Sequence, residues 1–274
     1  MDEIMKKQIY TLKGLNFSYY ATTAILLPYL PLYFQSEGFT SREIGILMMI
    51  GPFVAMFAQP FWGYVSDRLS KVKPIIFILW GLTILSSIGL FTTNGLSTAF
   101  LFVLLLYFFM MPSVPLLDSI TITSTMQAGT TYGTVRSWGS FGFSSIAMVS
   151  GYLISRIGGT AHIGVLYWGL WVFPLLLLFF LQDEKVNGSR ITLSSLKIVL
   201  QNRSFLWFLF MIFILIIPHR MNDSLFGLYL HHLGASDKWV GWAWALAALS
   251  EIPSFAFAGR FVQRFHELAL LGVV

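Results

Sequence analysis

Ionisable residues inside apolar stretches are the features of this chain most able to do chemistry. A charge in hydrocarbon is costly, so such a residue inside a membrane span is a functional candidate by default. Asp118 and Arg136 lie nine residues either side of Gln127, the predicted turn between two helices. In an antiparallel pair they share one depth, where the guanidinium fork can hold a carboxylate or a solute hydroxyl. We expect a solute-binding pair; the alternatives are a structural ion pair, or an Arg136 that belongs to the inner positive cluster.

Two further groups have the chemistry to carry a proton. His219, Arg220 and Asp223 are spaced three and four residues apart, so they can share one helix face. A carboxylate beside a histidine can relay a proton, although Arg220 can instead neutralise Asp223 internally. Glu251 has no basic residue within four positions. It is therefore predicted to be a proton-coupling site, unless its partner lies on another helix.

A short charged loop follows a second apolar stretch. Gly63 precedes Asp67 and Arg68. Lys71 and Lys73 follow and add two positive charges. We expect Gly63 to allow close helix packing, and the two charges to mark a cytoplasmic helix end. This pattern favours a conformational latch over a ligand site.

The elements that position these residues are predicted to be membrane helices. The chain is 56% hydrophobic and 11% charged, and its mean hydropathy is +0.74, whereas a soluble domain has roughly 25% charged residues. A spanning helix needs about 20 mostly apolar residues. Such stretches lie at residues 12–34, 44–65, 74–93, 98–125, 134–155, 163–181, 205–230 and 239–258, and a ninth begins near Glu267.

Prolines and glycines modify several of these helices. Proline removes a backbone hydrogen bond and kinks a helix; such residues are Pro28 and Pro31, Pro112 and Pro115, and Pro218. Gly139, Gly142 and Gly151 lie along the fifth helix, where they permit close helix approach. Helices of this kind suit a protein that rocks or bends.

The positive charges predict the orientation. Only Arg42, Arg156 and Lys238 fall in the predicted outer loops, while the inner segments hold most other Lys and Arg residues. Because cytoplasmic loops are enriched in Lys and Arg, we expect a multi-pass protein of the cell membrane with a cytoplasmic N-terminus.

An internal repeat predicts two related halves. Residues recur at an offset of 196 positions, as the following pairs show: Leu32 and Leu228, Tyr33 and Tyr229, Gly38 and Gly234, Gly45 and Gly241, Gly63 and Gly259, Arg68 and Arg264. Many secondary transporters are built from repeats, with the substrate site between them. We expect a six-helix bundle over residues 1–181, a cytoplasmic linker over 182–204, and a partial second bundle over 205–274, containing helices seven, eight and the start of nine. The second half is then incomplete.

The loop from Gly63 to Lys73 resembles the Gly-x-x-x-Asp-Arg-x-Gly-Arg-Arg motif of the major facilitator superfamily, and Gly259 to Arg264 is a weakened copy. The runs at residues 16–34, 59–63 and 132–143 resemble the branch that contains lactose permease, nucleoside–proton symporters and phenylpropionate permeases. The resemblance implies a major facilitator fold. It also implies that Asp118 and Arg136 bind substrate, with Phe143 where lactose permease has a sugar-stacking tryptophan and Ser140 where it has a cysteine.

Together these patterns predict a proton-coupled symporter that imports a small solute, with a sugar or oligosaccharide as the first candidate, by alternating access. The substrate-binding residues would be Asp118, Arg136, Phe143, Trp138, Asn16 and Tyr20, and Tyr19 is a further candidate. Proton coupling would fall to Glu251 or Asp223, with His219 and Arg220. The conformational motif would comprise Gly63, Asp67, Arg68, Gly259 and Arg264.

The alternatives are a proton-driven drug or metabolite exporter of the same fold, an aromatic acid or nucleoside importer, and a non-transporting membrane sensor. An enzyme is not expected, because the chain has no cysteine and no nucleophile constellation, metal-ligand spacing or phosphate-binding loop. The expected partners are the solute, protons and the lipid bilayer, for a monomer with no cofactor and no nucleic acid.

Overall fold

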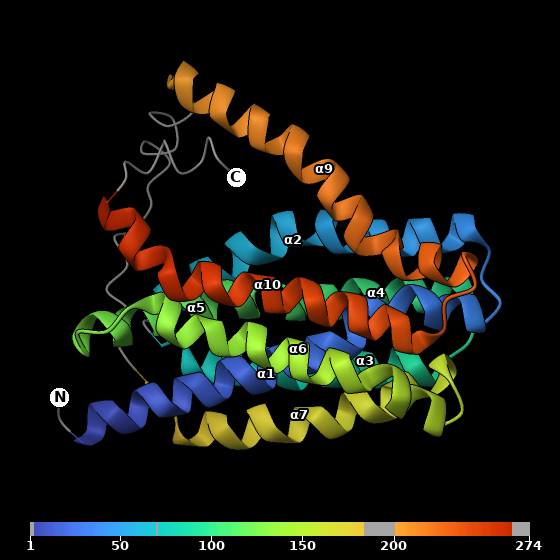
Figure 1. The fold of residues 1–274 in the computed structure, drawn as a ribbon, viewed down its shortest axis with the longest axis horizontal. Helices are drawn as coiled ribbons and strands as arrows, with labels where there is room; N and C mark the ends of the chain where they lie inside the picture. The colour runs from blue at the N-terminus through green and yellow to red at the C-terminus, as the bar shows by residue number, and fades with distance from the viewer. Residues whose placement is uncertain (1–2, 70, 184–200, 265–274) are drawn as a thin grey trace.

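The computed structural model describes residues 3–69, 71–183 and 201–264, and the side chains as far as residue 253. Nine α-helices occupy these residues: α1 (Glu3–Ser36), α2 (Ser41–Leu69), α3 (Lys73–Thr92), α4 (Leu96–Met110), α5 (Ser113–Gln127), α6 (Tyr132–Arg156), α7 (Ile163–Phe180), α9 (Arg203–His232) and α10 (Asp237–Arg264). Most of them lie side by side along the long axis of the molecule (Figure 1). The first half of α9 points away from the bundle, and its second half packs against it. The all-α prediction is confirmed. The ninth predicted helix, near Glu267, lies outside the described residues.

Within the part of the chain that the structure describes, five segments are long and apolar enough to cross a membrane: Ser41–Leu69, Lys73–Thr92, Leu96–Gln127, Thr160–Phe180 and Arg203–His232. The helices α1, α6 and α10 were also predicted as spans, but they carry more polar residues. In α1, for example, Gln8, Asn16, Thr22 and Thr23 are buried. A helix packed inside a bundle can bury polar side chains that a lipid-facing helix cannot, so these three helices are suited to line a polar site.

The predicted single helix over residues 98–125 is divided, because α4 ends at Met110 and α5 begins at Ser113. Prolines at positions 112 and 115 explain the division. Proline has no backbone N–H, so the carbonyls four residues earlier, those of Phe108 and Met111, receive no helical hydrogen bond. The break therefore places backbone acceptors in the middle of the bundle.

Aromatic packing holds α1 at the centre of the first seven helices. The ring of Tyr19 stacks on Trp80 of α3, with centroids 5.5 Å apart and planes inclined by 12°. Trp80 in turn meets Trp171 of α7 at 5.4 Å, and all three side chains are buried. Aromatic pairs of this kind contribute roughly 0.5–1.5 kcal/mol each beyond their buried area. The cluster therefore fixes the part of α1 from which Tyr19 and Tyr20 project.

Glycines of α6 allow two helices to approach it closely, as predicted. A side chain at Gly142 would meet the Phe17 carbonyl of α1, and one at Gly151 would meet the Asp237 backbone at the start of α10. The same expectation for Gly63 is wrong, because among the described residues nothing lies within 4 Å of the position its Cβ would take. The spacing of the loop motif does not report which face of α2 is packed.

Candidate functional site

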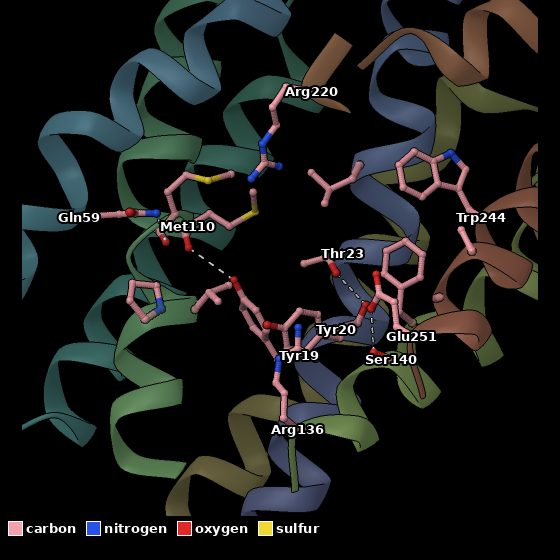
Figure 2. A pocket seen from close by; sticks show the side chains of 17 residues that line it. Tyr19, Tyr20, Thr23, Gln59, Met110, Arg136, Ser140, Arg220, Trp244 and Glu251 are labelled. Carbon is pink, nitrogen blue, oxygen red and sulfur yellow. Dashed lines mark hydrogen bonds between the residues drawn. The ribbon is translucent and has the colours of Figure 1, made fainter. Parts of the chain in front are cut away.

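A cavity of about 480 Å³ opens between α1, α2, the α4–α5 break, α6, α9 and α10 (Figure 2). Its volume lies within the range of about 300–1,000 Å³ that is usual for small-molecule sites. The wall is mainly apolar and aromatic, with a small number of charged and amide groups that include Gln59, Arg136, Arg220 and Glu251. This combination is typical of a site that binds and orients one small solute.

Aromatic rings form much of the wall nearest α6 and α10. Phe143 and Trp244 lie with their ring centroids 6.0 Å apart, and both line the cavity together with Tyr19 and Tyr20. The predicted position of Phe143 at the site is consistent with this arrangement. Flat apolar surfaces of this kind can stack against a sugar ring or an aromatic solute.

Arg136 of α6 projects into the cavity and stacks on an α1 ring. Its Cζ lies 4.1 Å from the centroid of Tyr20, a cation–π distance. The paired residue Asp118 is not among the described residues that line the cavity. Its carboxylate accepts a hydrogen bond of 2.9 Å from the Tyr132 hydroxyl, and its charge interacts with that of Arg136. The structure thus places Arg136 in the cavity wall, whereas Asp118 is not among the described lining residues.

Glu251 of α10 faces the same cavity. Its carboxylate accepts a hydrogen bond of 3.0 Å from the Ser140 hydroxyl of α6 (Figure 2). Glu251 has no basic residue within four positions along its own helix. Its hydrogen-bond partner Ser140 is neutral and lies on a helix that is distant in the sequence. Because a hydroxyl can donate to a carboxylate or accept from a carboxylic acid, Ser140 suits both protonation states.

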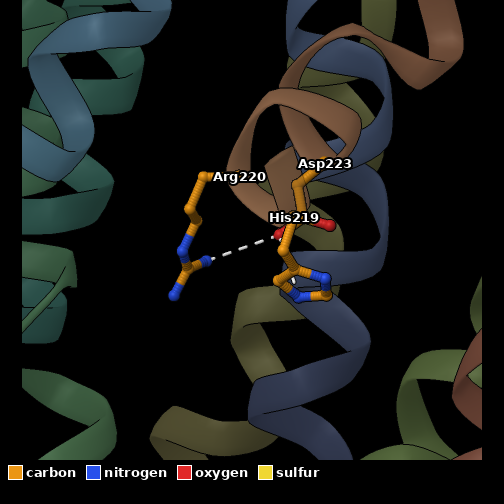
Figure 3. Close-up of polar contacts among 3 residues, drawn as sticks. All are labelled: His219, Arg220 and Asp223. Atoms are coloured by element: carbon orange, nitrogen blue, oxygen red, sulfur yellow. Dashed lines mark ion pairs between the residues drawn. The ribbon is translucent and has the colours of Figure 1, made fainter. Parts of the chain in front are cut away.

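The predicted cluster on α9 is assembled as its spacing indicated. Asp223 lies 3.5 Å from Arg220 and 3.7 Å from His219 (Figure 3). The side chains of His219 and Arg220 are 68% and 63% exposed, against 27% for Asp223. Arg220 alone of the three lines the cavity, so this cluster contributes a guanidinium, and not its carboxylate, to the cavity wall.

Two predicted substrate residues lie away from this cavity. Asn16 is fully buried, and its Nδ2 donates to the Leu12 carbonyl at 2.9 Å, one turn earlier in α1. Trp138 is 41% exposed and lies 5.9 Å from the Lys13 ammonium. Neither is among the described lining residues. Both lie on helices that line the cavity. Trp138 is two residues from the lining residues Arg136 and Ser140 and therefore projects from another face of α6, whereas Asn16 lies one turn before Tyr19 and Tyr20 on α1 and bonds to its own helix.

The loop motif borders a second, smaller cavity. A space of about 170 Å³ is lined by Gly63 and Asp67, and it shares Gln59 and Pro115 with the larger cavity. Arg68 lies in the last turn of α2. The repeat-related residues Gly259 and Arg264 belong to α10, and their side chains lie outside the described part of the chain.

Sequence reasoning missed several lining residues, above all those near the α4–α5 break. Met110, Met111, Gln59, Thr23 and Trp244 line the cavity. The signal for part of this set was present, because Pro112 and Pro115 free a backbone carbonyl of Met111 and a polar Gln59 stands inside an apolar stretch. Met110 and Trp244 carry no such signal, since a lipid-facing helix would have the same residue types.

Comparison with known proteins gives concordant matches. The MFS_1 like family profile matches residues 9–273. The "Uncharacterized transporter YwbF" of Bacillus subtilis (strain 168) is 26% identical over 98% of this chain and 67% of its own length. The "Maltose permease" of Geobacillus stearothermophilus is 30% identical over 90% of this chain and 63% of its own. The crystal structure of the nucleoside transporter NupG (D323A mutant) superposes with a TM-score of 0.76 at 19% identity, covering 94% of this chain and 69% of that one. The chain spans about two-thirds of the length of these relatives.

Proposed function

Because this chain belongs to the MFS_1 like family, whose members are major facilitator transporters and not enzymes, we propose that it imports a small solute together with protons. A sugar or oligosaccharide is the first candidate substrate, in keeping with a maltose permease among its relatives. The mechanism would be alternating access, in which two helical groups rock about a central site. We assign residues 1–181 to one group, 182–204 to the linker and 205–274 to the other, in a monomer with a cytoplasmic N-terminus.

The observation that carries this proposal is the meeting of Arg136 and Glu251 at one cavity. Arg136 comes from the first helical group and Glu251 from the second. Arg136 stacks on the ring of Tyr20, which lines the same space. A solute that binds Arg136 therefore reaches a carboxylate able to take up a proton, and binding of the two can be linked.

Protonation of Glu251 would control the rocking motion. A charged carboxylate is costly to move through an apolar environment, and a proton removes that cost. The Ser140 hydroxyl donates a hydrogen bond to this carboxylate and so joins the two helical groups. When the carboxylate takes up a proton, the carboxylic acid can donate to the hydroxyl instead, so protonation changes this link between the groups. Asp223 is the second candidate, but in this structure its carboxylate pairs with Arg220 and His219.

The experiment uses de-energised, lightly buffered cells that produce the complete gene product containing this chain, read with a pH electrode. Maltose, sucrose, uridine and 3-phenylpropionate are added in turn. Alkalinisation of the medium by one solute, lost in Arg136→Gln and kept in Arg156→Gln, is the expected result. Arg156 is a matched control because it lies on the same helix, at its far end, against Tyr152. No pH change with any solute would overturn proton-coupled import.

One observation favours a second function of the same fold. The cavity wall is rich in aromatic and methionine side chains, as Tyr20, Phe143, Trp244, Met110 and Met111 show, which suits an exporter of amphipathic solutes. The guanidinium groups of Arg136 and Arg220 in the same wall disfavour cationic cargo. Energy-dependent efflux of an anionic dye, without uptake of any tested solute, would select this alternative.

A further inference from the structure

We propose that the α4–α5 break and Gln59 form a hydroxyl-binding subsite, which selects a neutral, polyhydroxylated ring as the solute. This inference rests on the proposed function, because it names the substrate class for the same cavity. The residues that carry it are Gln59 on α2, Met110 and Met111 at the break, and Tyr19 on α1.

The Met111 carbonyl is the first acceptor of this subsite. Pro115 has no N–H, so this carbonyl has no helical donor and needs a partner from elsewhere. Its partner is the Gln59 side chain, whose Nε2 donates to it at 3.4 Å. An N–H···O hydrogen bond is usually about 2.9–3.0 Å long, so the contact is stretched. The acceptor is therefore held at the cavity wall by a weak bond that a better donor can replace.

A second stretched contact lies beside the first. The Tyr19 hydroxyl donates to the Met110 carbonyl at 3.4 Å (Figure 2), although O–H···O bonds are usually about 2.7–2.8 Å long. Tyr19, Gln59, Met110 and Met111 all line the cavity. Two adjacent carbonyls and two neutral side-chain donors thus form one wall of the cavity.

The chemistry of this wall suits a hydroxyl group. A hydroxyl both donates and accepts, so one solute hydroxyl can donate to the Met111 carbonyl while it accepts from Gln59 Nε2. A carboxylate only accepts, and two backbone carbonyl oxygens would repel it. A hydroxyl can therefore use both the donors and the acceptors of this wall, whereas an acid group can use only its donors and would be held better by Arg136 or Arg220 elsewhere in the cavity.

The opposite wall supplies the second point of recognition. In Figure 2, Gln59 and Met110 lie on one side of the cavity, and Glu251 and Trp244 lie on the other. A ring with hydroxyls around its edge, as in a disaccharide or the ribose of a nucleoside, can reach both walls. A phenylalkyl acid has a polar group at one end only, so it would leave one wall without a partner.

The test measures binding, which does not depend on proton coupling or on the direction of transport. Isothermal titration calorimetry on the purified complete gene product would use maltose, its mono-deoxy analogues, uridine and 3-phenylpropionate. Gln59→Leu removes the amide. Met56→Leu is the matched control, since Met56 lies on the same helix, is 69% exposed and is not among the described lining residues.

We expect Gln59→Leu to weaken maltose or uridine binding about tenfold, as for one lost hydrogen bond of ordinary strength, and Met56→Leu to leave it unchanged. One deoxy analogue should bind the wild type about tenfold more weakly and lose nothing further in Gln59→Leu. The analogues test the subsite on the wild type alone if the variant does not fold.

Three results would overturn the subsite: equal binding by Gln59→Leu and wild type, equal binding of every deoxy analogue, or binding of 3-phenylpropionate alone. Each leaves the proposed transport function intact. Loss of proton-coupled uptake in cells, with hydroxyl-dependent binding retained, would overturn the transport proposal and leave the subsite standing.

Discussion

The Ser140 hydroxyl of α6 donates a hydrogen bond of 3.0 Å to the Glu251 carboxylate of α10, across 111 residues of sequence. Both residues line the central cavity. The bond therefore links the first helical group to the second at the place where a solute would bind. If Glu251 carries the coupling proton, Ser140 is the residue that senses its charge, and this gives the first prediction.

Ser140→Ala should weaken solute uptake. The variant loses the hydrogen bond that joins the two helical groups at the Glu251 carboxylate. We expect the initial rate of uptake to fall about tenfold, as for one lost hydrogen bond of ordinary strength. Initial uptake rates in energised cells measure this. Ser145→Ala, whose hydroxyl donates to the Phe141 carbonyl on the same helix, should keep the wild-type rate, and an unchanged rate in Ser140→Ala would contradict the role.

Glu251→Gln should separate solute movement from proton movement. The amide has the size of the carboxylate but cannot take up and release a proton, so accumulation against a gradient should be lost while solute exchange continues. Counterflow in proteoliposomes and accumulation in energised cells measure the two properties separately. Asp223→Asn should weaken accumulation less, because this carboxylate pairs with Arg220. Accumulation that survives in the double variant would rule out both residues as coupling sites.

Gly142→Ala should destabilise the helical bundle. The added methyl group would meet the Phe17 backbone carbonyl, which cannot move aside as a flexible side chain can. Overpacking of this kind costs about 1–3 kcal/mol, so the midpoint of thermal unfolding in detergent should fall by several degrees. Gly81→Ala in α3 is the control, because among the described residues nothing lies within 4 Å of its Cβ position. Equal stability of the two variants would show that α1 and α6 do not depend on this contact.

Lys73→Met should loosen the ends of α3 and α7 without altering solute affinity. The Lys73 ammonium donates to the carbonyls of Phe179 and Leu181 at 3.0 and 2.6 Å, at the end of α7. In return, Asp183 Oδ1 accepts from the backbone N–H of Lys73 at the start of α3, at 3.3 Å. A cation at a helix C-terminus contributes about 0.3–1 kcal/mol, and we expect a stability loss of this size by chemical denaturation.

The exposed neighbour Lys71 provides the comparison for this pair of caps. Lys71→Met should leave stability unchanged, since the hydrogen bonds described at these helix ends are made by Lys73 and Asp183. A change in solute affinity in Lys73→Met, at unchanged stability, would mean that the capped ends transmit their position to the cavity.

Several features of the site could be predicted from local chemistry. Arg136 and Glu251 stand out because charged residues are rare in apolar helices, and both reach the cavity. The helical spacing is enough to predict that Asp223 lies within ion-pair distance of Arg220 and His219, because residues three and four apart share a helix face. The α4–α5 break follows from Pro112 and Pro115, although its boundaries were not anticipated.

Local patterns are enough to define this chain as a set of membrane helices with a family motif and a few charged residues inside apolar stretches, because hydropathy and helical spacing are properties of neighbouring residues. The pairing of Ser140 with Glu251 and of Gln59 with Met111 follows only from the folded arrangement. So does the surrounding of Gly63, whose Cβ position has no atom within 4 Å among the described residues. These outcomes depend on how each helix is rotated about its axis against partners that are distant in the sequence. That rotation is set by the packing of the whole bundle, which no local pattern records.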